Sequence, residues 1–289
     1  MFIADNWQDY EILDTGSGRK LERFGRYILD RPDPQVIWNT RLCPDKWKRA
    51  DGIYHRSNRG GGEWENISMP DAWQISYTFS DKAKLVFNLK PFAFKHTGIF
   101  PEQAANWEWS RALIKAAKRP VRVLNLFAYT GAATLACADA GAEVTHLDAS
   151  KGMVNWAKEN AASSKLDKKP IRWLFDDCTK FVQREIRRGN KYEAVIMDPP
   201  SYGRGPKGEV WKMEEMIFEF ISLTKQVLSD NPLFFLINSY SAGFAVSAVD
   251  YMLKLVFSDS HINVQELGIP VSGGERLVLP CGVSGRVIF

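Results

Sequence analysis

The sequence predicts an α/β protein in which a small β-rich domain is followed by a mostly parallel sheet covered by helices. From Val121 onward, short apolar runs typical of buried strands alternate with helical segments. Strands that alternate with helices form parallel sheets with both faces covered. Residues 1–90 differ, because Gly and Pro turns break them into short strand-like runs. We therefore expect two domains, residues 1–90 and residues 91–289.

The composition bounds the class of protein. A chain of 289 residues, 45% hydrophobic and 25% charged, is typical of a globular protein with a sizeable core. Its four cysteines are scattered, and they are Cys43, Cys137, Cys178 and Cys281. None has the C-x-x-C spacing of zinc or redox sites, so we expect no metal site. Few, scattered cysteines suit a protein of the reducing cytoplasm. The start of the chain lacks the basic and apolar regions of a signal peptide. No apolar run approaches the ~18 residues of a membrane span, and no pattern indicates an oligomeric state.

The basic excess lies in the front part of the chain. Residues 1–120 contain 19 Lys and Arg against 15 Asp and Glu, whereas residues 121–289 contain 19 of each kind. Seven of the ten tryptophans also lie in residues 1–120. Basic and aromatic residues together are compatible with nucleic-acid binding. A solvated surface over a Trp-rich core explains the same pattern, so both interpretations stay open.

The elements of the front part follow from its turns. The stretch DTGSGRKLERFGRYILDRPDP is typical of short strands joined by tight turns, and LVFNL, Leu85–Leu89, predicts another strand. We expect NRGGGEWE, Asn58–Glu65, to be a mobile loop. A helix is predicted for Glu102–Lys118, because Pro101 suits a helix start and Pro120 follows its end.

The α/β part alternates regularly. Apolar runs predict strands, and the segments between them predict helices; the strands are expected at residues 121–127, 143–148, 171–175, 194–198 and 233–239, with a last one near 286–289, and the helices at 132–140, 150–164, 178–188, 213–229 and 245–257. In such sheets, ligands bind at the carboxyl ends of the strands. The motifs discussed next all lie at such ends.

The stretch VLNLFAYTGAATLACADAGAEVTHLDAS predicts a cofactor site. It is a strand, a turn with one glycine at Ala128–Gly131, a helix, and a second strand that ends at Asp148. An acid at that place can bind ribose hydroxyls. A pyrophosphate requires a denser glycine turn such as G-x-G-x-x-G. The single glycine therefore favours S-adenosylmethionine (SAM), which carries an amino acid instead of phosphates, and NAD is the alternative.

The stretch DPPSYGRGP predicts a substrate wall. Asp198 ends the fourth strand, and Pro199 and Pro200 fix φ, remove two donors and keep the chain extended. We expect a rigid wall with unpaired carbonyls. These carbonyls and the Asp198 carboxylate, which would also lie beside the cofactor, can accept hydrogen bonds from the amine of a planar base. Tyr202 would stack on that base, which must leave its own stack to reach the pocket.

The segment GRGPKGEVWK follows this wall. Its cations Arg204, Lys207 and Lys212 stand among glycines, a pattern that suits contact with a phosphate backbone. A solvated loop is the alternative. A lid that orders on binding is compatible with both.

Together, LNLFAYTGAATLACADAGAEVTHLDAS and DPPSYGRGPKGEVWK resemble class I SAM-dependent methyltransferases. More narrowly, residues 90–289 resemble the bacterial 23S ribosomal RNA cytosine-C5 methyltransferases. The resemblance implies a Rossmann-like, seven-stranded sheet, SAM as cofactor, and RNA, in particular ribosomal RNA, as partner and substrate.

The resemblance also implies roles for individual residues. The turn residues would wrap the methionine part of SAM: Phe127, Ala128, Tyr129, Thr130 and Gly131. Asp148 would hold the ribose, with Ala149 and Ser150 after it. Asp177 would bind the adenine amino group beside Cys178, and Asp176 is the alternative partner. One of these two acids is expected to cap the next helix, which leaves the other available to the site. The segment KHTGIFPEQ resembles a family stretch that packs over SAM, which implies cofactor contacts for Thr97, Gly98 and Gln103.

One departure from the family concerns the nucleophile. Carbon-5 of cytosine reacts only after a cysteine adds to carbon-6. The family carries that cysteine after the fifth strand, where this chain reads INSYSAG, with Ser239 and Ser241. Cys281 is the remaining late candidate. We therefore expect methylation of a nitrogen rather than carbon-5, with Ser239 as a substrate contact. A methyltransferase for a small molecule or a protein, or a SAM-binding protein without catalysis, remains the alternative. His146 lies within a strand and is expected in the core.

Overall fold

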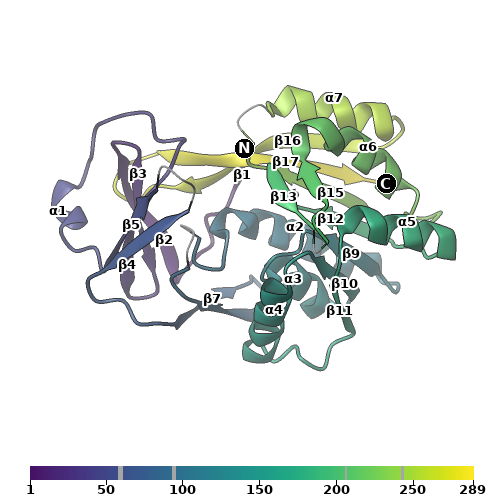
Figure 1. The fold of residues 1–289 in the computed structure, drawn as a ribbon, viewed down its shortest axis with the longest axis horizontal. Coiled ribbons are helices and arrows are strands. Elements are labelled where there is room, and N and C mark those ends of the chain that lie inside the picture. The colour runs from purple at the N-terminus through teal and green to yellow at the C-terminus, as the bar shows by residue number, and fades with distance from the viewer. Residues whose placement is uncertain (58–60, 93–95, 206, 242–243) are drawn as a thin grey trace. The chain divides into compact units, whose positions relative to one another are not determined.

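The computed structural model describes residues 1–57, 61–92, 96–205, 207–241 and 244–289. The chain forms two compact units (Figure 1). Unit 1 contains residues 1–2, 106–266 and 282–289, and unit 2 contains residues 3–105 and 267–281. The division into domains at residue 90 stays a prediction. In the described part of the chain, no helix has the length and apolar character that crossing a membrane requires.

The main sheet has eight strands in the order β1-β16-β17-β15-β12-β9-β10-β11 (Figure 1). Their bounds are Phe2–Ile3, His261–Pro270, Val278–Ile288, Phe234–Ser239, Ala194–Met197, Arg122–Leu126, Glu143–Asp148 and Ile171–Phe175. Strands β15, β12, β9, β10 and β11 run parallel, and β17 pairs antiparallel with β15. This arrangement confirms the predicted Rossmann-like fold class. The two-residue β1 extends the predicted seven strands to eight.

Helices cover both faces of this sheet, and they are α2 (Ala104–Ala117), α3 (Ala132–Asp139), α4 (Lys151–Ser163), α5 (Cys178–Arg188), α6 (Met213–Lys225) and α7 (Val246–Val256). Successive residues of a strand point to opposite faces. Accordingly, Leu124 belongs to the core cluster that contains residues of α5, α6 and α7, whereas Val123 belongs to the cluster that contains residues of α2 and α3. The parallel strands are therefore buried on both sides, as their apolar runs predicted.

The parallel register brings three strand ends to one level. Leu126, the last residue of β9, pairs with Leu147 of β10 and with Met197 of β12. The next residues along the chain, Phe127, Asp148 and Asp198, therefore leave the sheet at the same edge. This edge is where ligands bind in open α/β sheets.

Unit 2 confirms the β-rich N-terminal region. It contains a five-stranded sheet of β2 (Tyr10–Gly16), β3 (Arg19–Phe24), β4 (Tyr27–Pro32), β5 (Gly52–Arg56) and β6 (Gly62–Asn66). Strands β7 (Trp73–Thr78) and β8 (Lys84–Leu89) form a separate hairpin. The helical elements are the short helix α1 (Pro44–Trp47) and the 3-10 turn η1 (Pro101–Gln103). The prediction of a mobile loop over Asn58–Glu65 is wrong for Gly62–Glu65, because β6 pairs there with β5. Residues 58–60 lie outside the described residues.

The tryptophans of the front part are mostly packing residues. Trp47 and Trp107 are buried. Trp7, Trp64 and Trp73 make edge-to-face contacts with tyrosines. Trp38, 38% exposed, is the large exposed aromatic of this group. The tryptophan content thus reflects a Trp-rich core and does not by itself indicate a nucleic-acid surface.

A buried ionic cluster lies in the sheet of unit 2. Glu22 is fully buried and accepts two hydrogen bonds from the Arg31 guanidinium, at 2.7 and 2.8 Å, and one from the Tyr10 hydroxyl at 2.6 Å. The Lys20 ammonium lies 3.4 Å away. Burial raises the pKa of Glu22, but Arg31 and Lys20 outweigh it and hold this pKa at about 2.

We predict that Glu22→Gln lowers the free energy of unfolding by about 3–5 kcal/mol, because it leaves the buried Arg31 guanidinium without its carboxylate partner. Glu11→Gln is the matched control, since Glu11 pairs with Arg23 in the same sheet but is partly exposed. The control substitution should lower the free energy of unfolding by less than about 1 kcal/mol. Urea unfolding at pH 7 measures both, and equal losses would contradict the prediction.

The same substitution should change the acid response. Glu22 ionises near pH 2 in the folded protein and near 4.5 when unfolded, so its stabilisation is complete above about pH 4.5 and disappears as the pH falls toward 2. Glu22→Gln should remove this component of the pH dependence.

Candidate active site

The turn after β9 has an unusual backbone. Phe127, Tyr129 and Gly131 all have positive φ, at 55°, 49° and 86°. The left-handed conformation costs a non-glycine residue roughly 1–2 kcal/mol. At Gly131 a Cβ atom would also lie only 2.9 Å from the Cβ of Ala157. The single glycine of the motif is therefore required by both conformation and space.

Asp148 is fixed by backbone donors at the end of β10. Its Oδ2 accepts the Tyr129 N–H at 2.8 Å, and its Oδ1 accepts the Ser150 N–H at 2.8 Å. Burial raises the pKa of Asp148, whereas these two hydrogen bonds lower it. The carboxylate thus has a set orientation beside the turn, and its remaining lone pairs can accept ligand hydroxyls. Ser150 in turn caps α4 by accepting the Met153 N–H.

The two acids after β11 have different partners. Asp177 caps α5, because its Oδ1 accepts the Lys180 N–H at 2.8 Å, which confirms that one of the two acids is a helix cap. Asp176 forms an ion pair with Arg184. A Cβ atom on Gly205 would lie 3.1 Å from the other Asp177 oxygen, Oδ2, so that oxygen lies close to the loop after the substrate wall. Cys178 is buried, and burial raises the pKa of its thiol well above the ordinary value.

The substrate wall is held by the hairpin that follows it, β13 (Tyr202–Arg204) and β14 (Val210–Lys212). The Trp211 indole N–H donates to the Pro200 carbonyl at 2.7 Å. The expectation that the carbonyls of the wall are unpaired is therefore wrong for Pro200. The hairpin returns β14 to the wall, and no local signal in the sequence reveals that pairing. Trp211 also contacts Phe127, with ring centroids 5.0 Å apart, so it joins the wall to the turn after β9.

The predicted phosphate contacts lie on this hairpin and its loop. Arg204, Lys207 and Tyr202 are exposed, and the Lys212 ammonium pairs with Glu215 at 2.8 Å. An ion pair between Lys180 and Glu209 links the loop to α5, and Glu209 also accepts the Lys207 N–H at 2.8 Å.

The serines at the end of β15 and after Pro200 differ in how exposed they are. Ser239 is 3% exposed and accepts the Ser241 N–H at 3.3 Å. The Ser241 hydroxyl donates to the Ser201 hydroxyl at 2.7 Å, which connects the end of β15 to the segment after Pro200. Direct contact between Ser239 and a substrate stays a prediction. The hydroxyls closer to the surface belong to Ser241, which the comparison with the family's cysteine segment had named, and to Ser201, which it had not.

Other predicted residues belong to unit 2. Thr97 has a fully buried hydroxyl with no hydrogen-bond partner among the residues that the structure describes. Gly98 has a φ of 109°, and Gln103 is buried. An unsatisfied buried hydroxyl is uncommon and fits a residue that binds a ligand. The cofactor role of these three residues stays a prediction.

The remaining candidate thiol is unsuited to nucleophilic attack. Cys281 lies in unit 2, and its Sγ is 3.3 Å from the Leu279 carbonyl oxygen. Burial raises the pKa of this thiol well above its ordinary value. The thiolate is the reactive form of cysteine, so Cys281 stays protonated and unreactive at neutral pH.

His146 is a core residue, as predicted. Its Nδ1 lies 2.9 Å from the Thr134 hydroxyl, which also accepts a hydrogen bond from Asn125 at 2.9 Å. Burial lowers the pKa of His146 to about 3, so the ring is neutral.

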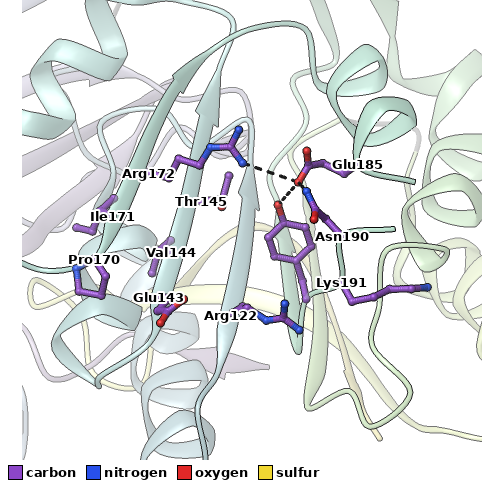
Figure 2. Close-up of a pocket in the computed structure, with 11 residues that line it drawn as sticks. Arg122, Glu143, Val144, Thr145, Pro170, Ile171, Arg172, Glu185, Asn190 and Lys191 are labelled. Atoms are coloured by element: carbon purple, nitrogen blue, oxygen red, sulfur yellow. Dashed lines mark hydrogen bonds and ion pairs between the residues drawn. The ribbon is translucent and has the colours of Figure 1, made fainter. Parts of the chain in front are cut away.

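A pocket of about 460 Å³ lies elsewhere on the sheet (Figure 2). Residues that line it, such as Arg122, Glu143 and Ile171, begin strands β9, β10 and β11, so it lies at the amino edge. In Figure 2 Arg172 extends toward Glu185, at 3.9 Å, and Glu185 also accepts the Tyr192 hydroxyl at 2.7 Å. One strand length, roughly 17 Å, separates this edge from Asp148. The pocket is therefore not part of the candidate active site.

Comparison with known proteins assigns the family. The family of S-adenosylmethionine-dependent methyltransferases matches residues 54–216, which is more than half of the chain. This chain belongs to the SAM-dependent methyltransferase family. The methyltransferase thus uses SAM as its cofactor.

Two further comparisons agree. The methyltransferase is 35% identical to a SAM-dependent methyltransferase from Agrobacterium tumefaciens, whose crystal structure matches 99% of this chain and 93% of that one with a TM-score of 0.91. A SAM-dependent methyltransferase from Streptococcus mutans shares the fold at 18% identity, 98% and 76% coverage and a TM-score of 0.71.

A curated relative is the ribosomal RNA large subunit methyltransferase K/L of Pseudoalteromonas atlantica, 32% identical over 62% of this chain. The alignment covers 22% of that longer protein.

We predict that His146 makes the methyltransferase sensitive to mild acid. The unfolded state binds a proton near pH 6.5 and the folded state only near pH 3, so stability is retained above 6.5 and lost as the pH falls below it. The free energy of unfolding can fall by as much as about 1.4 kcal/mol per pH unit in this range. His146→Gln should flatten the dependence between pH 6.5 and 4 in urea unfolding. Parallel curves for the two proteins would contradict this.

Proposed function

We propose that this methyltransferase methylates a nitrogen of an RNA base, in ribosomal RNA, in the cytoplasm. The observation that carries the proposal is the Asp198-Pro199-Pro200 wall, which leaves β12 at the same edge and level as the turn after β9 and Asp148. The names of the curated relatives support ribosomal RNA as the substrate. The domain of residues 1–90 would position that RNA. The basic excess of residues 1–120 comes mainly from residues 91–120, which contain five Lys and Arg against two Asp and Glu.

The cofactor residues keep the roles that the family resemblance implies. Phe127–Gly131 would hold the methionine part of SAM, Asp148 the ribose, and Asp177 with Cys178 the adenine. The geometry fits these roles, because the turn permits close approach and Asp148 has a fixed carboxylate. The Oδ1 of Asp177 caps α5, so its Oδ2 is the oxygen that would accept the amino group.

The chemistry places few demands on the protein. SAM supplies a methyl group bound to a sulfonium sulfur. When a nitrogen lone pair attacks the methyl carbon, the sulfur leaves as a neutral thioether. The protein must align that nitrogen with the methyl carbon and accept a proton from it. Asp198 would hydrogen bond to the nitrogen and take the proton. The two prolines and Trp211 would keep the wall rigid, and the exposed Tyr202 ring would stack on the base.

Carbon-5 chemistry has no evident nucleophile. Serines stand at positions 239 and 241, Cys178 is buried, Cys281 is half-buried, and loss of solvation raises the pKa of both thiols. A nitrogen target needs no covalent enzyme intermediate. The lack of a cysteine at positions 239 and 241 therefore supports nitrogen.

We predict that Asp198→Ala abolishes methyl transfer, by about 100-fold or more, because the acceptor of the proton is lost. The measurement is transfer of labelled methyl from SAM to total RNA of a strain lacking the gene. Binding of S-adenosylhomocysteine should stay within about threefold of wild type. Asp230→Ala removes an exposed acid and serves as the control.

Two results would overturn the proposal. Label that enters only protein or small molecules after nuclease treatment would exclude RNA as the substrate. Unchanged transfer by Asp198→Ala would remove the proposed role of that carboxylate.

We further predict that Cys281→Ser retains methyl transfer to RNA within about twofold, since a thiol with a raised pKa stays protonated and is a poor nucleophile. RNA containing 5-fluorocytosine should form no covalent adduct with the wild-type enzyme on a denaturing gel. An adduct that disappears in Cys281→Ser would establish carbon-5 chemistry instead.

A further inference from the structure

The turn after β9 must be held in place by its surroundings. Phe127 and Tyr129 are non-glycine residues in the left-handed conformation. Such residues persist only where neighbouring groups fix them, and they concentrate at ligand sites. The Asp148 carboxylate fixes one side of the turn by accepting the Tyr129 N–H. A second restraint acts on the next residue, Thr130.

That second restraint is Asn160 of α4. Its side chain is fully buried, and its Nδ2 donates to the Thr130 carbonyl at 2.9 Å. Residues three apart on a helix share a face, and Ala157, on the same face, lies against Gly131. One face of α4 therefore supports both of the last two residues of the turn.

Burying an amide lowers the stability of the fold unless the amide is hydrogen bonded. The Asn160 side chain therefore depends on its hydrogen bond to the turn. The hydrogen bond sets the direction of the Thr130 carbonyl and with it the plane of the Thr130–Gly131 peptide. The Gly131 N–H on that peptide donates to the Ala128 carbonyl at 3.0 Å, which closes the turn. Asn160 thus acts on the whole turn through one peptide group.

We propose that Asn160 is a positioning residue that presets the Phe127–Gly131 turn for the amino-acid end of SAM. The inference rests on the proposed role of this turn in holding the methionine part. In the proposed assignment Asp148 and Asp177 hold the adenosine part. Asp148 is also fixed from outside the turn by the Ser150 N–H. Asp177 is fixed by the Lys180 N–H. Loss of the amide should therefore weaken binding of the amino-acid end and leave adenosine binding intact.

The test compares two ligands by calorimetry. S-adenosylhomocysteine carries the amino-acid end, whereas 5′-methylthioadenosine has the same adenosine and sulfur without it. Asn160→Leu should raise the Kd for S-adenosylhomocysteine about tenfold and change the Kd for 5′-methylthioadenosine by less than about twofold. Asn155→Leu, an exposed asparagine on the same helix, is the control and should change neither.

Each alternative outcome is distinguishable. Equal weakening of both ligands, or no weakening of either, would overturn the positioning role. If wild type binds both ligands equally well, the assignment of the turn to the methionine part fails instead, and the inference with it. Asn160→Ser, whose short hydroxyl cannot reach the Thr130 carbonyl, gives the same comparison should the leucine variant not fold.

Discussion

The register of three parallel strands is the constraint on which the rest of this methyltransferase depends. Leu126 of β9 pairs with both Leu147 of β10 and Met197 of β12, so the chain leaves all three strands at one level. A shift of one residue in any strand would move its side chains into the core cluster of the opposite face, where other partners surround them. The packing of these two clusters therefore fixes where the turn, Asp148 and Asp198 emerge.

The loops at this edge are coupled by a small number of long-range contacts. Trp211 contacts the wall through the Pro200 carbonyl and the turn through the Phe127 ring. Ser241 connects the end of β15 to Ser201. Because each contact joins segments from different strands, the site is a shared framework rather than a set of independent loops. Such frameworks keep reacting groups aligned, which is the main task of an enzyme whose cofactor carries the reactive group.

The titratable groups of the chain differ in their surroundings. Cys178 and His146 are buried and Cys281 is half-buried, and loss of solvation shifts the pKa of each toward its neutral form. The carboxylates at the carboxyl edge, by contrast, have specific backbone or cation partners.

The sequence by itself determined the parallel strands and the helices between them, because their signals are local. It did not predict β13, β14 or β16. The bounds of α5 follow from Asp177 as its cap and Gly189, with φ of 69°, at its end, both within one turn of the helix. The glycine at position 131 and the acid at position 148 were likewise visible in one strand–turn–helix–strand unit. The steric reason for Gly131 was not, because the atom that a side chain would meet belongs to Ala157.

Only the tertiary structure decided which groups meet across the fold. The hydrogen bond from Asn160 to Thr130 spans 30 residues, and the bond between Ser241 and Ser201 spans 40. Neither leaves a pattern in the sequence, since a buried amide or a hydroxyl looks the same whatever its partner is. The pairing of the Pro200 carbonyl with Trp211 and of β6 with β5 escaped the sequence for the same reason. Local propensity sets the elements, whereas packing of distant segments sets the partners of their polar groups.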